Sequence, residues 1–181
     1  QSEYMHSIIS ILSDAFPYLA EKIPTTNYKS LCDSFTTVIL NHFQNLIYRY
    51  KRIKGPGTQQ LLLDVTSLTS FLKLVLNSGD PERFDEDEVL SFAKKVQQRA
   101  VKVESILKVL LAPPEALVET YKGLIQNGSV QDLQLIMELQ GLPKNERSAL
   151  IEEYNQNKKK SIVGATADVL VGGVHDFSNK T

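Results

Sequence analysis

The sequence predicts an all-α protein built from tandem helical bundles. Apolar residues recur at steps of three and four along most of the chain, which places them on one face of a helix. The segments between these patterns carry the proline, glycine, asparagine and serine residues that begin and end helices. Between residues 104 and 154, three helix-to-helix turns occur and no strand pattern appears. Such short helices can bury their apolar faces only by packing together and against a longer element.

The first two helices are expected at residues 1–23 and 28–52. Pro17 predicts a kink or a break in the first, because proline removes an N–H and clashes with the preceding turn. The second ends in basic residues, which suit the negative end of a helix dipole. Its inward face is expected to carry Leu31, Phe35, Val38, His42 or Phe43, Leu46 and Tyr50.

Two further long helices are expected at residues 58–76 and 85–111. The sequence Gly55-Pro56-Gly57 predicts a break before the first of them. Acidic residues 85–88 begin the second, where the helix dipole favours negative charge. The inward face of this second helix is the longest uninterrupted pattern in the chain: Val89, Phe92, Val96, Ala100, Val103, Leu107 and Leu110.

Three shorter helices follow, separated by strong turn sequences. Pro113 and Pro114 end the long helix and can begin the next. Asn127-Gly128 is expected to end that helix, with Gly128 in the left-handed conformation. Ser129 then caps a helix that Gly141 closes, and Asn145 or a neighbour caps the last. Residues 161–181 lack a helical pattern and predict a loosely ordered tail.

Composition limits the classes of function. The 181 residues are 42% hydrophobic and 23% charged, as in a globular protein, and the net charge of −1 argues against a general nucleic-acid binder. The single cysteine, Cys32, excludes an internal disulfide framework. No apolar run approaches the roughly 20 residues of a membrane-spanning helix. The chain opens on Gln1, so we expect a piece of a longer protein.

No pattern of catalytic or metal-binding residues stands out. The three histidines lie at no metal-ligand spacing with cysteine or carboxylate residues, so neither a metal nor another cofactor is expected. Cys32 has no basic neighbour that would activate its thiol and is expected to be buried and inert. Phosphate-binding and nucleophile motifs are absent from the sequence. These residues therefore favour an interaction module over an enzyme.

Three sequence segments, in this order, carry a resemblance to a known family. They are QQLLLD at 59–64 followed by Ser67-Leu68, ESILKV at 104–109 running into Ala112-Pro113, and LQGL at 139–142 followed by Glu146. Together they resemble the C-terminal region of the vacuolar protein sorting 53 subunit of the Golgi-associated retrograde protein (GARP) complex. The resemblance covers residues 2–154, and Val118 to Tyr121 fits the helix between the second and third segments. Gln140 departs from the family pattern, which has a lysine before Gly-Leu.

The resemblance implies a role in vesicle tethering. It implies a distal piece of a helical rod in a multisubunit tether that captures endosome-derived carriers at the trans-Golgi network. The expected partners are other tether subunits, SNARE proteins, and small GTPases or vesicle components. The expected location is peripheral, on the cytoplasmic face of trans-Golgi and endosome membranes. Such a domain acts by binding and has no active site to transfer.

Two sets of residues are candidates for these contacts. Polar residues inside the three segments and the helix between them are candidates for a partner-binding surface, with capping and internal hydrogen bonding as the alternative for each: Gln60, Asp64, Glu104, Lys108, Glu119 and Tyr121. A basic cluster is a candidate for contact with anionic lipid headgroups, with a solvated helix end as the alternative: Arg49, Lys51, Arg52 and Lys54. If the second set contacts lipid, the alternative function is that of a peripheral membrane-binding helical module.

The chain is expected to divide into three parts. Residues 1–111 would form a bundle of longer helices, and residues 112–160 a C-terminal bundle of short helices. The two bundles would share the helix at 85–111, which would act as a strut for both of them. Residues 161–181 would be the tail.

Overall fold

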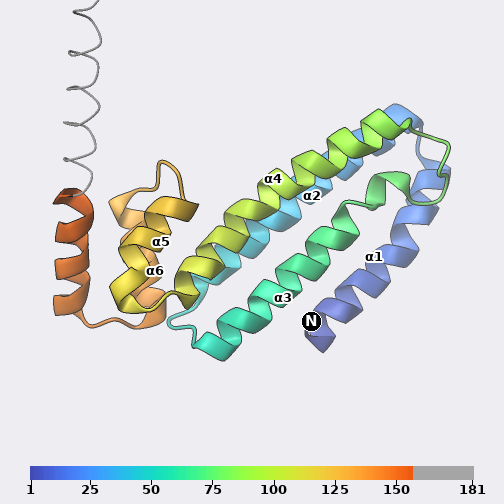
Figure 1. Ribbon diagram of the computed structural model, residues 1–181. Coiled ribbons are helices and arrows are strands. Elements are labelled where there is room, and N and C mark those ends of the chain that lie inside the picture. The colour runs from blue at the N-terminus through green and yellow to red at the C-terminus, as the bar shows by residue number, and fades with distance from the viewer. Residues whose placement is uncertain (157–181) are drawn as a thin grey trace, which may run out of the picture.

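The computed structural model describes residues 1–156, and every regular element in that span is a helix (Figure 1). The predicted tail at 161–181 lies outside the described residues. Six α-helices, two short 3-10 helices and a final helix at 144–156 follow one another: α1 (Glu3–Lys22), α2 (Thr25–Arg49), α3 (Gly55–Leu72), η1 (Val75–Asn77), α4 (Glu86–Leu111), η2 (Pro114–Ala116), α5 (Leu117–Leu124) and α6 (Val130–Gln140). The all-α prediction is confirmed for these residues.

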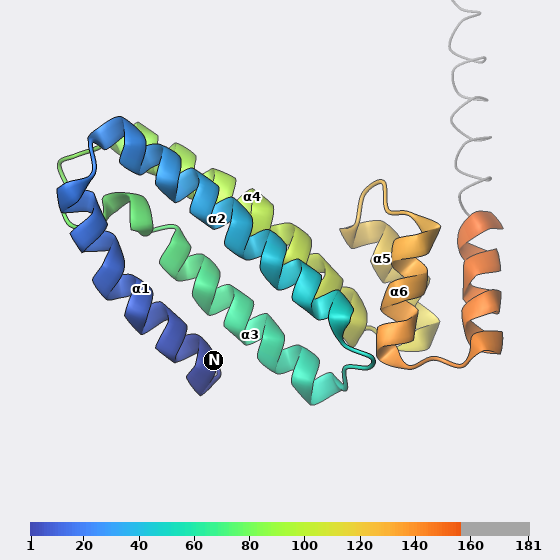
Figure 2. The same cartoon turned by 180° about the vertical axis from the view of Figure 1, so that it is seen from behind.

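The four long helices lie side by side and form the larger half of the molecule (Figures 1 and 2). α4 packs against both α2 and α3, and α1 packs mainly against α3. Phe16 is the aromatic centre of this half, because its ring makes edge contacts with the rings of Tyr28, Phe35 and Phe71. We call this part, residues 1–111, the long half.

The short helices pack at the end of the long ones (Figure 1). α5 and α6 both contact α4, and the helix at 144–156 adds Tyr154 to their shared core. We call this part, residues 112–156, the short half. Its apolar cluster also includes residues of the long half, such as Ile47 and Val65. Because that cluster draws on both sides of residue 111, the division into separate units at this residue stays a prediction.

α4 confirms the helix predicted at 85–111. The carboxylate of Asp85 caps it by accepting the backbone N–H of Glu88 at 2.7 Å, and acidic residues fill the first turn. All but the first of its predicted inward residues are buried, and Val89 is half-buried. The buried residues of α4 up to Ala100 belong to the apolar cluster of the long half. Its buried apolar residues from Val103 onward belong to the cluster of the short half. The helix therefore spans both cores.

The start of α3 differs from the prediction. α3 begins at Gly55, so Gly55-Pro56-Gly57 is the first turn of a helix and not a break. Proline is tolerated there because the first helical residues have no intrahelical partner for their N–H groups. α3 also ends at Leu72, before the 3-10 turn η1. Of the kink or break predicted at Pro17, the break is excluded, because α1 continues through this residue to Lys22, and a kink stays a prediction.

The inward face of α2 is displaced from the predicted one. Val38 and Tyr50 are 66% and 53% exposed, and His42 is exposed as well. The fully buried residues are Tyr28, Cys32, Thr36, Leu40 and Ile47. Burial of Thr36 is tolerated because its hydroxyl donates to the carbonyl of Asp33 at 3.0 Å, so an apolar pattern alone missed it.

The turns of the short half confirm two predictions and correct one. Ser129 caps α6 by accepting the N–H of Asp132 at 3.0 Å, and Gly141 closes it with φ of 80°. The prediction for Gly128 was wrong, because the preceding residue Asn127 adopts the positive φ, at 60°. Gly128 is instead required by space, since the ring of Tyr121 occupies the position of a Cβ atom.

Candidate partner-binding surfaces

Asp64 and Gln60 form a buried latch at the start of the chain. Asp64 is only 5% exposed, and its carboxylate accepts the backbone N–H of Ser2 at 2.6 Å and the Ser2 hydroxyl at 2.9 Å. Gln60 donates its amide to the same carboxylate at 3.1 Å. Ser2 is the N-cap of α1, so these bonds fasten the beginning of α1 to α3. Asp64 is thus engaged within the fold.

Tyr121 is also engaged within the fold. Its side chain is fully buried, and its hydroxyl donates to the carbonyl of Ser129 at 2.9 Å. Its ring meets that of Tyr154 edge to face at 5.8 Å between centroids. Burial, with a smaller contribution from the charge of Asp132, raises the pKa of Tyr121 well above its usual range. The hydroxyl is therefore a structural donor at the α5–α6 turn.

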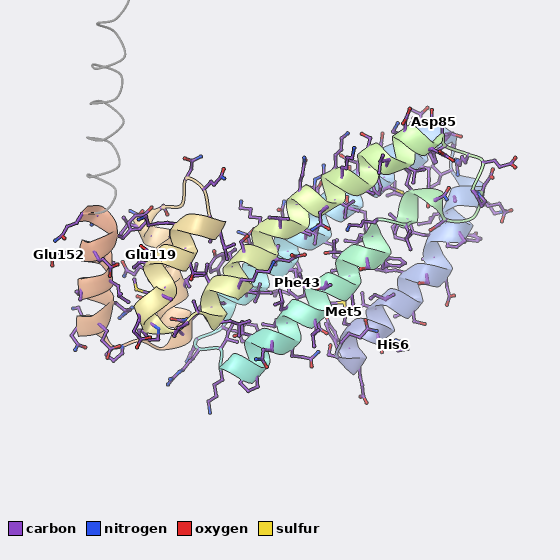
Figure 3. The ribbon with its side chains drawn as sticks, in the orientation of Figure 1. Met5, His6, Phe43, Asp85, Glu119 and Glu152 are labelled. Atoms are coloured by element: carbon purple, nitrogen blue, oxygen red, sulfur yellow. The ribbon has the colours of Figure 1, made fainter. Side chains whose placement is uncertain are left out.

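The other three polar candidates reach the surface from two helices. Glu104 and Lys108 form an i, i+4 ion pair at 3.4 Å along α4, with Lys108 exposed. Glu119 is exposed on α5 (Figure 3). The structure thus does not gather the six candidates on one surface. Contact of the exposed members with a partner stays a prediction.

The basic cluster lies at the joint between the two halves. Arg49, Lys51, Arg52 and Lys54 are all exposed around the loop from α2 to α3. Ile53 fixes this loop, because it is buried and its N–H donates to the carbonyl of Leu139 at 2.8 Å. The Arg52 guanidinium lies against Gly141, where a Cβ atom would clash with it. The cluster is therefore held in place by the fold, and its contact with lipid stays a prediction.

A small apolar cavity beside this cluster was not predicted. It has a volume of about 190 Å³ and lies between the first turn of α1, the end of α2 and α3. Tyr4, Leu46 and Tyr50 line it and are 71%, 39% and 53% exposed. Sequence patterns could not find it, because both Leu46 and Tyr50 fit the apolar face expected to be in the core.

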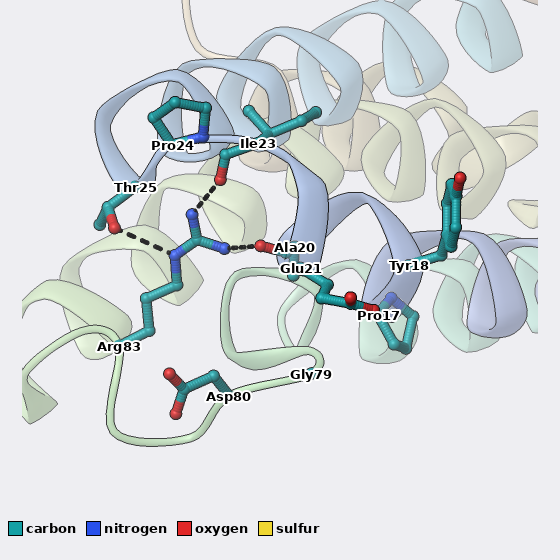
Figure 4. Close-up of a pocket in the computed structure, with 10 residues that line it drawn as sticks. All are labelled: Pro17, Tyr18, Ala20, Glu21, Ile23, Pro24, Thr25, Gly79, Asp80 and Arg83. Atoms are coloured by element: carbon teal, nitrogen blue, oxygen red, sulfur yellow. Dashed lines mark hydrogen bonds between the residues drawn. The ribbon is translucent and has the colours of Figure 1, made fainter.

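The largest cavity, about 690 Å³, surrounds Arg83 at the end of α1 (Figure 4). The Arg83 guanidinium donates to the carbonyls of Ala20 and Ile23 and, at 3.2 Å, to the hydroxyl of Thr25. These groups belong to the end of α1 and the start of α2, so Arg83 takes the place of a helix cap. Its charge is used inside the protein, which indicates a structural role for this cavity.

Within residues 1–156, histidine, cysteine and carboxylate side chains form no group that could hold a metal ion. None of the helices in this span combines the length and apolar character that a membrane crossing requires.

Burial raises the pKa of the Cys32 thiol to about 11, so the thiol is protonated at neutral pH. The expectation that this cysteine is buried is confirmed.

Comparison with known proteins decides the family. Residues 59–142 match the model of the family described as "Vacuolar protein sorting-associated protein 53 C-terminus". Vacuolar protein sorting-associated protein 53 A of Arabidopsis thaliana is 27% identical over 157 residues, covering 87% of this chain. The Caenorhabditis elegans homolog is 26% identical over 165 residues, covering 85% of the chain. The resemblance of the chain to the C-terminal region of this family is thus confirmed.

The match to the model of the vacuolar protein sorting-associated protein 53 C-terminus extends from within α3 to the turn after α6. It includes all of α4, which contributes to the apolar clusters of both halves. The chain corresponds to 18% of the Arabidopsis relative and 20% of the Caenorhabditis relative, about a fifth of each. No solved structure matches the chain.

Gln140, where the pattern of the resembled family has a lysine, caps the end of α4. Its side-chain amide donates to the carbonyls of Val109, Leu110 and Ala112 at 3.4, 3.0 and 2.9 Å. The Val109 carbonyl also accepts the backbone N–H of Ala112 at 3.0 Å, so the amide serves chiefly the carbonyls of Leu110 and Ala112. A lysine ammonium, which has three N–H donors, can serve the same carbonyls. The departure therefore preserves the cap.

Proposed function

We propose that the chain is a binding domain in a subunit of the GARP vesicle-tethering complex. In this proposal the subunit acts in retrograde transport from endosomes to the trans-Golgi network. The domain binds other tether subunits. SNARE proteins, small GTPases or carrier components contact the helical rod of which the domain is part. It works at the cytoplasmic face of trans-Golgi and endosome membranes as a peripheral protein.

The match of residues 59–142 to the family carries this proposal. The helical architecture supports it, because helical bundles joined by a shared helix suit a rod that presents surfaces along its length. The role of the whole complex is part of the proposal, since the chain corresponds to about a fifth of its relatives.

We propose a binding role without catalysis. The arginine in the largest cavity is bonded to helix-end carbonyls, and the most buried carboxylate, that of Asp64, accepts three hydrogen bonds. An active site needs polar groups that are placed for a substrate. The groups named here already serve the fold.

Replacement of the natural subunit in cells tests the proposal. Cells that lack it would receive the full-length subunit or a version lacking residues 1–156, and return of a cycling cargo receptor to the Golgi would be measured. The full-length subunit should restore retrieval and the deleted one should not. Equal retrieval with both versions, at equal protein levels, would show that the domain has no role in this transport.

Membrane binding through the basic cluster is a second candidate. The observation that favours it is the fixed, exposed arrangement of Arg49, Lys51, Arg52 and Lys54 in one loop. Each cation near an anionic surface contributes about 1 kcal/mol. Flotation with liposomes containing phosphatidylserine should show salt-sensitive binding, lost in a Lys51→Glu, Lys54→Glu variant. Binding that is equal with neutral liposomes would exclude this role for the cluster.

A further inference from the structure

α1 has two apolar faces, and only one of them is covered. The inward face carries the buried residues Met5, Phe16 and Ala20. A second line follows steps of four, three, four and three residues: Tyr4, Ile8, Ile11, Ala15 and Tyr18. We call these five residues the α1 seam. Tyr4, Ile11 and Tyr18 are 71%, 68% and 62% exposed, and the seven-residue spacing places them in one line along the helix.

The seam differs from the other exposed apolar residues of the chain. Leu63, Leu74 and Leu90 are also more than half exposed, but each stands on a different segment, and the exposed Val38 and Tyr50 lie twelve residues apart, on α2 and just after it. Single exposed apolar residues are normal on protein surfaces. Three exposed apolar residues in one line, together with Ile8 and Ala15, form a continuous apolar face whose exposure to water is unfavourable.

The spacing of the seam is that of helix-to-helix packing. Alternating steps of three and four are the pattern by which one helix inserts side chains between those of another. From Tyr4 to Tyr18 the seam covers fourteen residue-to-residue steps, or about 21 Å of helix at 1.5 Å per step. This length accommodates roughly two heptads of a partner helix.

Charges beside the seam define the edge of such a partner. One flank of the seam is the core of the protein itself, through Met5, Leu12 and Leu19. The open flank carries Ser7, Asp14 and Glu21, all exposed. Lys22 pairs with Glu21, with 2.6 Å between its ammonium and that carboxylate, and the ammonium lies over the Tyr18 ring at 5.8 Å from its centroid. Among residues 1–156, the Asp14 carboxylate of this flank makes no such pair, so it disfavours an anionic membrane and favours a helix with a basic residue along its edge.

The apolar cavity extends the seam at one end. Tyr4 begins the seam and also lines the cavity of about 190 Å³, together with Leu46 of α2 and Tyr50 at its C-cap, and Asp64 is the one charged residue in the otherwise apolar or aromatic lining. A cavity of this kind accepts one apolar side chain from a partner. Anchoring side chains in such pockets commonly dominate the energy of a protein interface.

We propose that the α1 seam docks an amphipathic helix of another tether subunit. That helix carries apolar residues at alternating steps of three and four, and lysine or arginine on the edge that faces Asp14 and Glu21. The inference rests on the proposed function, because it takes the partner from the tether.

Site-specific photocrosslinking in the assembled tether tests this inference. The full-length subunit would carry a photoreactive residue at Ile11 or, as a control, at Leu90, which is exposed on α4 away from the seam. Position 11 should crosslink to one helix of another subunit with the stated pattern, and position 90 should not reach that helix. Crosslinks from position 11 to a second copy, to lipid or to no molecule would overturn the proposal.

Substitutions give an independent measure. Ile11→Glu should weaken binding of the crosslinked subunit at least tenfold, and Leu90→Glu should leave it unchanged, with both variants folded by circular dichroism. Asp14→Lys should weaken binding and Asp14→Glu should not. Unchanged binding by Ile11→Glu would refute the seam and leave the tether role intact. Failure of the wild-type subunit to associate with any tether subunit would refute the proposed function itself.

Discussion

The long and short halves of the molecule are stabilised by different means. In the long half, helices of 18 to 26 residues lie side by side, and apolar side chains cover their shared faces. In the short half, α5 and α6 have only 8 and 11 residues. A helix leaves about four N–H and four carbonyl groups unpaired at its ends, whatever its length. Short helices therefore depend more on side chains that bond to the backbone at their turns.

The bonds in the short half bear this out. Tyr121 donates to the carbonyl of Ser129 and Tyr154 to that of Gly128, at 2.9 and 2.8 Å. Gln140 serves carbonyls at the end of α4, and Ser129 caps α6. Single side chains at turns should therefore matter more to stability here than exposed residues of the long helices.

Gly128→Ala should have the largest effect. A Cβ atom there would lie 2.2 Å from the Tyr121 hydroxyl oxygen, which is buried and bonded. Relief requires movement of the tyrosine, at a cost of roughly 1–3 kcal/mol for overpacking and more if its hydrogen bond breaks. Chemical denaturation should show this loss in the free energy of unfolding.

Gly123→Ala is the matched control for that substitution. Gly123 lies within α5, and no atom comes within 4 Å of the added methyl group. Alanine should stabilise the helix there by about 0.5–1 kcal/mol. Similar stabilities for the two variants would show that the turn is not tightly packed.

Tyr154→Phe should have the next largest effect. It removes the hydroxyl that donates to the buried carbonyl of Gly128 and keeps the ring against Tyr121. An unpaired buried carbonyl costs about 1–3 kcal/mol. Tyr18→Phe, at an exposed position of α1, should change stability little. If both variants unfold at the wild-type denaturant concentration, the tyrosine bond does not stabilise the turn.

Much of the fold could be predicted because its determinants are local. The acids at the start of α4, the Ser129 cap and Gly141 are written in adjacent residues, and so were found. The latch between Ser2 and Asp64 joins residues 62 apart, and the bond from Tyr154 to Gly128 joins residues 26 apart. No local pattern reports such pairs.

The α1 seam was not predicted, because the apolar pattern of this helix marks the inward face of Met5, Leu12 and Phe16 and does not report whether a second line beside it stays exposed. For the polar candidates, the sequence left contact with a partner and internal hydrogen bonding both open. Asp64 and Tyr121 interrupt apolar segments as a binding residue would, yet the structure places both inside. Only tertiary contacts distinguish an internal donor or acceptor from a surface contact.

Gln140 offers a test of moderate size at the joint between the halves. Gln140→Ala removes the donor to the carbonyls at the end of α4, with an expected loss of roughly 1.5 kcal/mol. Gln140→Lys follows the family pattern, retains N–H donors and adds positive charge at a helix C-terminus. Its stability in denaturant should equal or exceed that of the wild type. A lysine variant as weak as the alanine variant would show that capping does not explain the family pattern.

The smallest effect is the share of the alkaline loss of stability that Cys32 contributes in the long half, beside the shares of buried tyrosines such as Tyr28 and Tyr121. Burial raises the pKa of the Cys32 thiol from 9.0 to about 11. Below pH 9 the thiol is protonated in both states, and between about 9 and 11 only the unfolded chain releases the proton. The free energy of unfolding should therefore fall in this window as pH rises, by on the order of 1 kcal/mol at pH 10.

Cys32→Ala separates this titration from the packing of the side chain. The variant lowers stability at every pH through its lost contacts, but its stability should fall less steeply between pH 9 and 11. Tyr154→Phe, in the short half, should keep the wild-type slope in the same window while its stability is lower throughout. Denaturation series of the three proteins at half-unit steps of pH measure both quantities. Parallel curves for wild type and Cys32→Ala would assign the alkaline loss to other groups, and would remove this distinction between the halves.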